Sequence, residues 1–359
     1  MTLSPIFRSH NAVEALKSRG YLDRLAPSIA AERAYVDTLH GLLADVIDRR
    51  YLADHIVRAD DIAFLQEHFF LTLFDSVFRA LGCPAQRLHT YGLLNLCVKG
   101  LVVSGDNLFD NEAKMDLPLA LGKGRMFASI MQMLCFDHLV MRILEKHPPG
   151  PPEDGAIRYR RDLLNELAFI GTLEGSEEAG VNTILPMDTM IEQVHEVRGG
   201  LLFSLAFIAP RVWEPADQQD RWATARRGIA RLGTAFQIVD DLTDFEFDLT
   251  RRSHNALAAR IAHDGTPAEK AAFEPLWAGQ QPAAGVVERS FRESARAVLT
   301  RARIEAERGF ADLAELGFWY PPKDADLFVR AIAGDAGDDR IDALTTRSEG
   351  KGGRLKVEG

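Results

Sequence analysis

The sequence predicts an all-α protein with an extensive core. Apolar residues recur at three- and four-residue intervals along most of the chain, and no sustained alternation of apolar and polar residues is bounded by turn residues. Two segments, 126–144 and 201–208, are apolar nearly all round, as expected for helices inside a large bundle. With 359 residues, 47% of them hydrophobic, the chain can bury such a core.

The periodic segments give the expected helices in order: 28–48, 59–81, 86–111, 120–146, 158–174, 187–208, 218–248 and 285–315. Segments rich in proline and glycine separate several of them, at residues 147–155, 175–186, 263–267 and 280–285. From residue 337 onward the apolar rhythm is lost and glycine and charge increase. We therefore expect one helical domain over residues 1–336 and a flexible tail over residues 337–359.

The overall charge limits the classes of partner. A formal net charge of -10 argues against a general affinity for nucleic acid, and an anionic substrate would need a local cation or a bound metal. Three cysteines without Cys-x-x-Cys spacing indicate neither a disulfide framework nor a zinc site. The longest apolar stretch, 199–210, is too short to span a bilayer. We expect a soluble cytoplasmic protein without a transmembrane segment.

The most informative segment lies at 233–245, within the seventh expected helix. On a helix it places an amide and three carboxylates on one stripe, at Gln237, Asp240, Asp241 and Asp244. Three like charges on one stripe repel each other unless a divalent cation lies over them, and oxygen ligands of this kind suit Mg²⁺ or Mn²⁺. A solvated acidic face is the alternative, but the flanking residues are largely apolar. The stripe is therefore predicted to be a metal site.

A second polar cluster lies far upstream, near the end of the third expected helix. Asp106 and Asp110 are four residues apart and share a helix face, with Asn107 beside them. Such a pair near a helix end is more often structural when it occurs alone. Its partnership with the downstream stripe favours a role in the same metal site.

These residues resemble the trans-isoprenyl diphosphate synthases and the class I terpene synthases related to them. Gly-x-x-Phe-Gln-Ile-x-Asp-Asp-x-x-Asp, ending at Asp244, is similar to the second aspartate-rich motif of that family. Asp106-Asn107-x-x-Asp110 resembles a variant of the first motif. The segment 197–203, Val-Arg-Gly-Gly-Leu-Leu-Phe, stands where the family has Lys-Thr-x-x-Leu-Phe. The resemblance covers roughly residues 30 to 335.

The resemblance implies a bundle of antiparallel helices around a deep apolar cavity, with the two acidic clusters facing each other across its mouth. Three Mg²⁺ ions would join the carboxylates to a prenyl diphosphate and assist departure of the diphosphate. The metal ligands would be Asp106, Asn107, Asp110, Asp240, Asp241 and Asp244. A homodimer is the family's usual assembly and is expected here too.

Several side chains are candidates for binding the diphosphate. By resemblance Arg198 takes the place of the family's lysine, and Gly199 and Gly200 would allow a large anion to approach; alternatively Arg198 pairs with Glu192 or Glu196. Lys99 reaches either the cavity mouth or solvent. The remaining candidates are Gln237, Arg251 and Arg252, although a basic pair after an acidic run is more often surface charge balance.

Departures from the family shift the expected reaction. Elongating members bind isopentenyl diphosphate with a Gly-Lys-x-x-Arg-Pro segment before the first motif and an Arg-Arg pair after it, and this sequence has neither. We therefore predict a terpene synthase-like enzyme that ionises one allylic prenyl diphosphate and rearranges the carbocation. A prenyltransferase with an altered acceptor site and a non-catalytic regulatory homologue are the alternatives.

The walls of the expected cavity are less well specified by the sequence. By resemblance Leu101 and Val102 would form its floor. Apolar side chains of the fourth expected helix either line the cavity or belong to plain core, namely Phe127, Met131, Met133, Phe136 and Met141. His138 and His195 lack the spacing of metal-binding histidines and are interpreted as structural.

Overall fold

The computed structural model describes residues 6–54, 60–109, 112 and 114–345. In this part the chain is helical, and its extended residues pair only in an isolated bridge between Leu52 and Leu119. The larger helices are α1 (His10–Ser18), α2 (Tyr21–Leu43), α3 (Asp61–Ala80), α4 (Ala85–Phe109), α5 (Arg125–Lys146), α6 (Gly155–Gly175), α10 (Gln219–Thr243), α11 (Phe245–Arg251), α12 (Ala256–Asp264), α13 (Pro267–Trp277), α15 (Arg292–Ala314) and α16 (Ala325–Thr345).

Shorter helical pieces connect them. A stretch of π-helix, η2 (Ile191–Leu201), follows α7 (Met187–Met190) and continues into α8 (Leu202–Ser204), η3 (Leu205–Phe207) and α9 (Ile208–Trp213). The others are η1 (Arg49–Tyr51), η4 (Ala216–Gln218), α14 (Val286–Ser290) and η5 (Pro322–Asp324). The buried apolar side chains of all these elements form one connected core.

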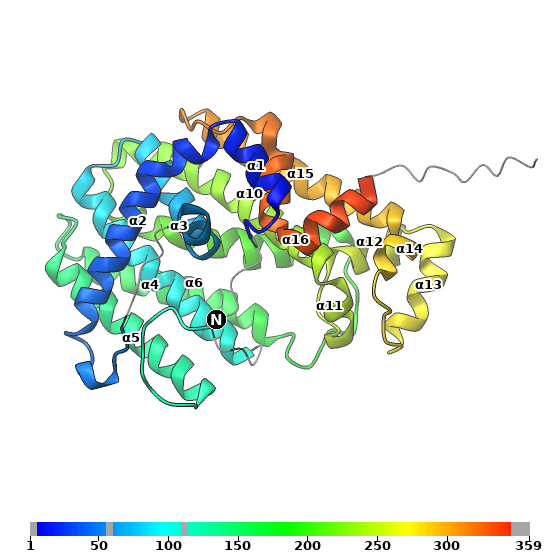
Figure 1. The fold of residues 1–359 in the computed structure, drawn as a ribbon, viewed down its shortest axis with the longest axis horizontal. Coiled ribbons are helices and arrows are strands. Elements are labelled where there is room, and N and C mark those ends of the chain that lie inside the picture. Colours follow the sequence, from blue (N-terminus) through cyan, green and yellow to red (C-terminus); the bar gives the residue numbers. More distant parts are fainter. Residues whose placement is uncertain (1–5, 55–59, 110–111, 113, 346–359) are drawn as a thin grey trace, which may run out of the picture.

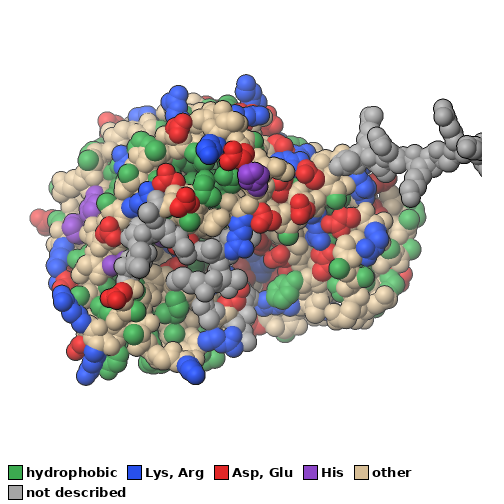
Figure 2. Space-filling view, viewed as in Figure 1, with side chains coloured by type: hydrophobic (Ala, Val, Ile, Leu, Met, Phe, Trp, Pro, Cys, Tyr) green, Lys and Arg blue, Asp and Glu red, His purple; other side chains and the backbone are tan. Residues whose placement is uncertain are grey.

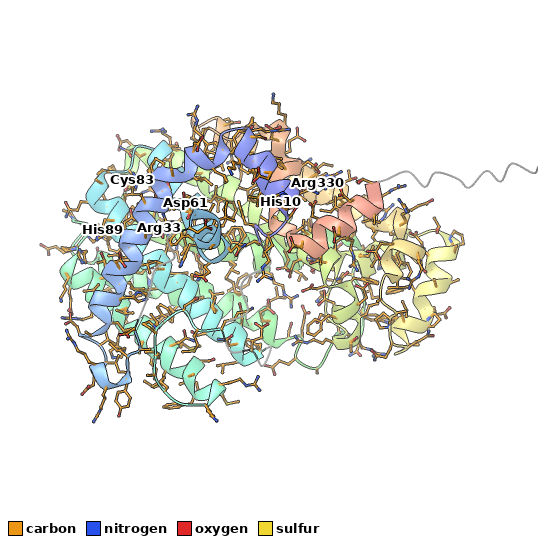
Figure 3. All side chains as sticks on the ribbon, viewed as in Figure 1. His10, Arg33, Asp61, Cys83, His89 and Arg330 are labelled. Carbon is orange, nitrogen blue, oxygen red and sulfur yellow. The ribbon has the colours of Figure 1, made fainter. Side chains whose placement is uncertain are left out.

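The bundle is built around α10, which packs against α15, α16 and η2 (Figure 1). Helices α2 to α5 pack against one another on one side of the molecule, and α12 to α14 lie toward the opposite end. Figure 3 shows one tie within the first group: Arg33 of α2 meets Asp61 at the start of α3, with 2.7 Å between Nη2 and Oδ1. The cavity described below is lined mainly by α2 to α5 and by α10 and α11, and none of its described lining residues lies on α12 to α14.

Glycines fix α10 against two of its neighbours. A Cβ atom on Gly228 would lie 2.8 Å from the carbonyl oxygen of Gly309 in α15, and one on Gly233 would lie 2.2 Å from that of Gly199 in η2. Neither helix pair could approach this closely with a larger side chain in place of the glycine. The carboxylate-bearing end of α10 is therefore held rigidly between η2 and α15.

The all-α prediction is confirmed, and each of the eight expected helical segments falls on helical structure. Several boundaries differ: the helix expected at 28–48 is α2 at 21–43, α5 begins at Arg125 rather than 120, and 285–315 divides into α14 and α15. The expected helix 218–248 breaks at Asp244 into α10 and α11, and residues 191–201 form a π-helix. The prediction missed α1, α12, α13 and α16. Pro267 and Thr266, interpreted as a break between helices, are the start of one: Thr266 caps α13 in a capping box with Glu269.

The flexible tail is predicted to begin at residue 337, but helix α16 continues to Thr345. Residues 337–345 belong to α16, and Gly337, Ile341 and Leu344 are buried. The helix is kinked at Gly334, whose φ of 73° is a backbone conformation that strongly favours glycine. The kink changes the direction of the helix, so the apolar periodicity does not continue in register beyond it. Residues 346–359 lie outside the described part of the chain, so the remainder of the tail stays a prediction.

Helix α5 does not lie wholly inside the bundle, contrary to the expectation for residues 126–144. One face packs against α4, whereas Met126, Phe127, Ile130 and Leu134 are exposed. Among the described helices, α5 alone is long and apolar enough to cross a membrane by length and composition, and half of that stretch is buried in the protein. This half-burial is typical of a globular protein's core helix that also presents an apolar surface.

Candidate active site

A cavity of about 1660 Å³ is lined mainly by α2 to α5 and by α10 and α11, and its walls carry both apolar side chains and many carboxylates. Figure 2 shows acidic and basic side chains gathered around a hollow in the middle of the molecule. The apolar lining includes Leu71, Phe74, Leu96, Phe136 and Phe203. A pocket with both kinds of lining suits a ligand that has a long apolar part and a polar head.

The acidic stripe of α10 faces this cavity. Asp240 and Asp244 line it, and the carboxylate of Asp240 makes no hydrogen bond or ion pair with any residue that the structure describes. Burial and the charges of Asp244 and Asp241 raise the pKa of Asp240 to about 8, against the opposing effect of Lys114 and Arg198. Partial burial, with the charge of Asp241, also raises the pKa of Asp244. The protein alone does not neutralise these carboxylates.

Asp241 is held differently from its neighbours. Its Oδ2 atom accepts hydrogen bonds from Nε2 of buried His195 at 2.7 Å and from the backbone N–H of Ala256 at 2.5 Å. Its Oδ1 atom accepts one from Gln237 at 3.3 Å. Asp241 therefore anchors the start of α12 and η2, and its predicted role as a metal ligand stays a prediction. The contact also explains His195 as a structural histidine.

The upstream cluster is only partly as predicted. Asp106 lines the cavity, whereas Asp110 lies outside the described residues. Asn107 is buried, and its amide makes two hydrogen bonds to the backbone of Lys114: Nδ2 donates to the carbonyl oxygen at 2.7 Å and Oδ1 accepts from the N–H at 3.0 Å. Asn107 is thus corrected from metal ligand to loop anchor, because both ends of its amide are already bonded within the protein.

Gln132 of α5 completes this anchor. Its Nε2 atom donates to the same Lys114 carbonyl at 3.0 Å, and its Oε1 atom accepts from the N–H groups of Asp116 and Leu117 at 2.8 and 3.2 Å. The loop so held presents Lys114 and Asp116 to the cavity. Lys99 also lines the cavity, with its Nζ atom 3.0 Å from Oδ1 of Asp116.

Arg198 lies in the cavity wall, but with partners other than those expected. Its Nε atom is 2.7 Å from Oε1 of Glu174, and Nη2 is 2.9 Å from Oε1 of Glu177, so the pairing with Glu192 or Glu196 is wrong. Gly199 and Gly200 pack closely on α10, where added Cβ atoms would meet Gly233 and Thr234. The glycines therefore serve helix packing, which corrects the idea that they admit the anion.

The two arginines at the end of α11 have different surroundings. Arg251 lines the cavity, and its guanidinium lies over the ring of Phe247, 5.4 Å from the centroid. Arg252 lies over the ring of Trp277 in α13 and donates a hydrogen bond to the Trp277 carbonyl at 3.2 Å. Arg252 is not among the described residues that line the cavity, and its predicted role in binding the diphosphate stays a prediction.

Solved structures with the same architecture identify the fold. The decaprenyl diphosphate synthase of Rhodobacter capsulatus superposes with a TM-score of 0.57 at 18% identity, over 87% of this chain and 98% of that chain. The geranylgeranyl pyrophosphate synthetase of Pyrococcus horikoshii gives a TM-score of 0.54 at 15% identity, over 86% and 98%. The chain has the class I isoprenoid synthase fold. No protein-family model and no curated protein matches the sequence.

Within the class I isoprenoid synthase fold, the cavity also contains residues that the sequence did not single out. Glu174 and Glu177 from the end of α6, Asp248 of α11 and His254 before α12 all line it. Burial and the charge of Asp241 raise the pKa of Asp248 well above its usual value. Asp248 lies four residues beyond Asp244 and extends the acidic stripe, which is the one local signal that would have revealed it.

The donor set fits Mg²⁺ in one particular mode. Among the described residues, no three His, Cys, Asp or Glu side chains converge closely enough to enclose an ion by themselves. Mg²⁺ is usually held by one or two carboxylates together with substrate phosphate oxygens and water. Asp240 and Asp244, with carboxylates turned to the cavity and raised pKa values, suit this shared coordination.

The residues that line the cavity match the prediction only in part. Val102 and Phe136 line it, whereas Leu101, Phe127, Met131, Met133 and Met141 are not among its described lining residues. The Phe136 ring lies where a Cβ on Gly100 would come within 2.1 Å of it, so glycine at this position lets α4 and α5 approach closely. Helix packing therefore fixes this aromatic wall.

Proposed function

We propose that the chain is a Mg²⁺-dependent enzyme that ionises an allylic prenyl diphosphate. The observation that carries this proposal is that Asp240 and Asp244 line a cavity that many apolar side chains also line. Unneutralised carboxylates on a buried stripe destabilise a fold, so their presence is best explained by a cation that binds them. The family resemblance and the shared fold support the same conclusion.

In the proposed reaction the protein binds the diphosphate end of the substrate through metal ions and cationic side chains, and the prenyl chain through apolar side chains. Asp106, Asp240 and Asp244 would hold Mg²⁺, with Mn²⁺ as a possible substitute, and the family pattern suggests three ions. When bound, the ions supply Lewis-acid assistance as the carbon–oxygen bond to the diphosphate breaks. Arg198 and Arg251 face the diphosphate, and Phe74, Phe136 and their neighbours exclude water from the carbocation.

The charge of the cavity argues against a second diphosphate. Carboxylates dominate its polar lining, whose described lysines and arginines are Lys99, Lys114, Arg198 and Arg251. Three of these four are paired with Asp116, Glu112 and the Glu174–Glu177 pair respectively. A second anionic substrate would meet no basic clamp. We therefore favour a terpene synthase-like fate, in which the carbocation cyclises, rearranges or loses a proton.

Prenyl transfer is the second candidate, and the structural neighbours favour it. The solved structures of similar fold are a decaprenyl diphosphate synthase, a geranylgeranyl pyrophosphate synthetase and a polyprenyl synthetase, the last from Streptomyces coelicolor with a TM-score of 0.50 at 19% identity, over 89% of this chain and 98% of that chain. If this chain is a transferase, its cavity charge favours an acceptor without a diphosphate.

The deciding experiment supplies geranyl, farnesyl or geranylgeranyl diphosphate with Mg²⁺, each with and without isopentenyl diphosphate. We expect hydrocarbons or alcohols and released diphosphate without isopentenyl diphosphate. Longer prenyl alcohols, seen after phosphatase treatment only when isopentenyl diphosphate is present, would establish elongation instead. Absence of diphosphate release from every substrate would contradict the proposal and support the non-catalytic alternative.

We further propose that the enzyme is a cytoplasmic homodimer joined through α5 and α6. Its cysteines are unpaired, as expected in a reducing compartment. Exposed apolar side chains gather on α5 at Ile130 and Leu134, and on α6 at Leu164 and Phe169. Light scattering should give a dimer for the native chain and a monomer for Ile130→Glu/Leu134→Glu. The control, Ile304→Glu, alters an exposed apolar residue on α15 and should remain dimeric.

A further inference from the structure

A glutamate–histidine pair in the cavity wall has no part in the ionisation step. Glu177, just beyond the end of α6, and His254, just before α12, are both lining residues. Oε1 of Glu177 is 2.6 Å from Nδ1 of His254, and Oε2 accepts the backbone N–H of His254 at 3.0 Å. One carboxylate therefore holds both the ring and the main chain of the same residue.

This geometry fixes which ring nitrogen is available to a substrate. An ionised carboxylate only accepts hydrogen bonds, so Nδ1 must carry the proton that it shares with Glu177. Burial alone would raise the pKa of Glu177, but the hydrogen bonds from His254 and the charge of Arg198 outweigh burial and lower it. The carboxylate thus accepts the hydrogen bond from Nδ1, which leaves Nε2 as the ring nitrogen available to the cavity.

The pair also lies beside the groups assigned to the diphosphate. Nη2 of Arg198 is 2.9 Å from the same Oε1 atom that Nδ1 of His254 contacts. Asn255, next in the chain, donates to the backbone carbonyl of Asp241 at 2.7 Å and to Oδ2 of Asp248 at 2.8 Å. His254 is therefore tied from both sides to the acidic end of the cavity, where the allylic carbon would lie.

We propose that His254 is a catalytic base that accepts the proton lost by the carbocation, and that Glu177 is the residue that positions it. The inference rests on the proposed function and extends it to the last chemical step. A carbon–hydrogen bond beside the cationic carbon breaks, its electron pair forms the new double bond, and the proton passes to Nε2. The proton leaves to water after the product departs. Prenyl transfer to a carbon acceptor also ends with loss of a proton, so the assignment holds for either fate.

His254→Asn is the main test, because the side-chain amide of asparagine can still donate to Glu177 while nothing replaces Nε2. We expect the share of the native alkene among the products to fall by at least about tenfold. Alcohols from trapping by water, or isomeric alkenes, should replace it. In His254→Ala, added imidazole should restore the native product, because it supplies a base in the space vacated by the ring.

Two further variants separate catalysis from loop structure. His263→Asn is the matched control, because His263 of α12 contacts the carbonyl of Ile184 at 2.8 Å and is not among the described lining residues. Its product ratio should equal that of the native enzyme. Glu177→Gln should shift the products in the same direction as His254→Asn, but less. Unchanged product ratios in folded His254→Asn and His254→Ala would overturn the inference while leaving ionisation intact. Absence of diphosphate release from the native enzyme would overturn the proposed function and the inference together.

Discussion

The two polar clusters at the cavity contain similar residues but are used in opposite ways. On α10, Asp240 and Asp244 line the cavity, and the carboxylate of Asp240 makes no hydrogen bond or ion pair among the described residues. At the end of α4, Asn107 turns inward and fastens the loop that carries Lys114. The α10 wall therefore presents a run of carboxylates to the cavity, whereas the α4 wall presents Asp106 together with a lysine whose backbone is held by a buried amide. Similar residues in the two motifs therefore do not imply similar functions.

The largest expected effect comes from the α10 wall. Asp240→Asn should lower turnover by at least about 10³-fold, because it removes a carboxylate that holds the metal while charge develops on the leaving group. Helical content by circular dichroism should stay unchanged, since the carboxylate makes no hydrogen bond or ion pair within the described part of the chain. Loss of folding in both Asp240→Asn and Asp244→Asn would count against a metal site.

Loss of Arg198 should lower activity more than loss of Lys114. Arg198→Ala should lower kcat/KM by about 10- to 100-fold and raise KM, because it removes the guanidinium and leaves Glu174 and Glu177 unneutralised beside the diphosphate. Lys114→Ala on the opposite wall should have a smaller effect, since that ammonium is more exposed and already pairs with Glu112. Steady-state kinetics on both variants would check the order, and equal effects would contradict it.

The residues of the α10 wall could be predicted from the sequence more fully than those of the α4 wall. A helix brings residues three, four and seven apart onto one face, so the α10 stripe and the long periodic helices followed from local spacing. The partners of Arg198 and His254 did not, because Glu177 is 21 and 77 residues away from them and meets them only through the fold. Asn107 was assigned by analogy with the α10 motif, and no local pattern revealed its contact with a loop.

The loop anchor on the α4 wall gives the next test. Asn107→Asp should destabilise the protein by about 1–3 kcal/mol, because a carboxylate cannot donate to the Lys114 carbonyl and the two oxygens would repel each other at 2.7 Å. Chemical unfolding of the metal-free protein would measure the change, with Asn182→Asp, at an exposed position, as a control of the same charge. Tighter Mg²⁺ binding with unchanged stability would instead restore Asn107 to the metal site.

The smallest expected effect is a pH dependence that belongs to the α10 wall alone. The folded protein raises the pKa of Asp240 to about 8, above the value of an unfolded aspartate near 3.8, so the folded state holds this proton more tightly. The contribution of Asp240 to the stability of the metal-free protein should therefore be fully present below about pH 4. It should be lost progressively as the pH rises from about 4 to 8. Because Asp240 is partly open to the cavity, we expect a change on the order of 1–2 kcal/mol.

Two controls assign that pH dependence to its wall. Asp240→Asn should flatten the decline in unfolding free energy between pH 4 and 8, since the amide has no proton to lose. Asn107→Ala should lower stability equally at every pH, because the amide that it removes does not ionise. Mg²⁺ should stabilise the native protein more at pH 8 than at pH 6, since the ion competes with the proton for the same carboxylate. A slope that survives in Asp240→Asn would place the titrating group elsewhere and would remove the main energetic reason for a cation on this wall.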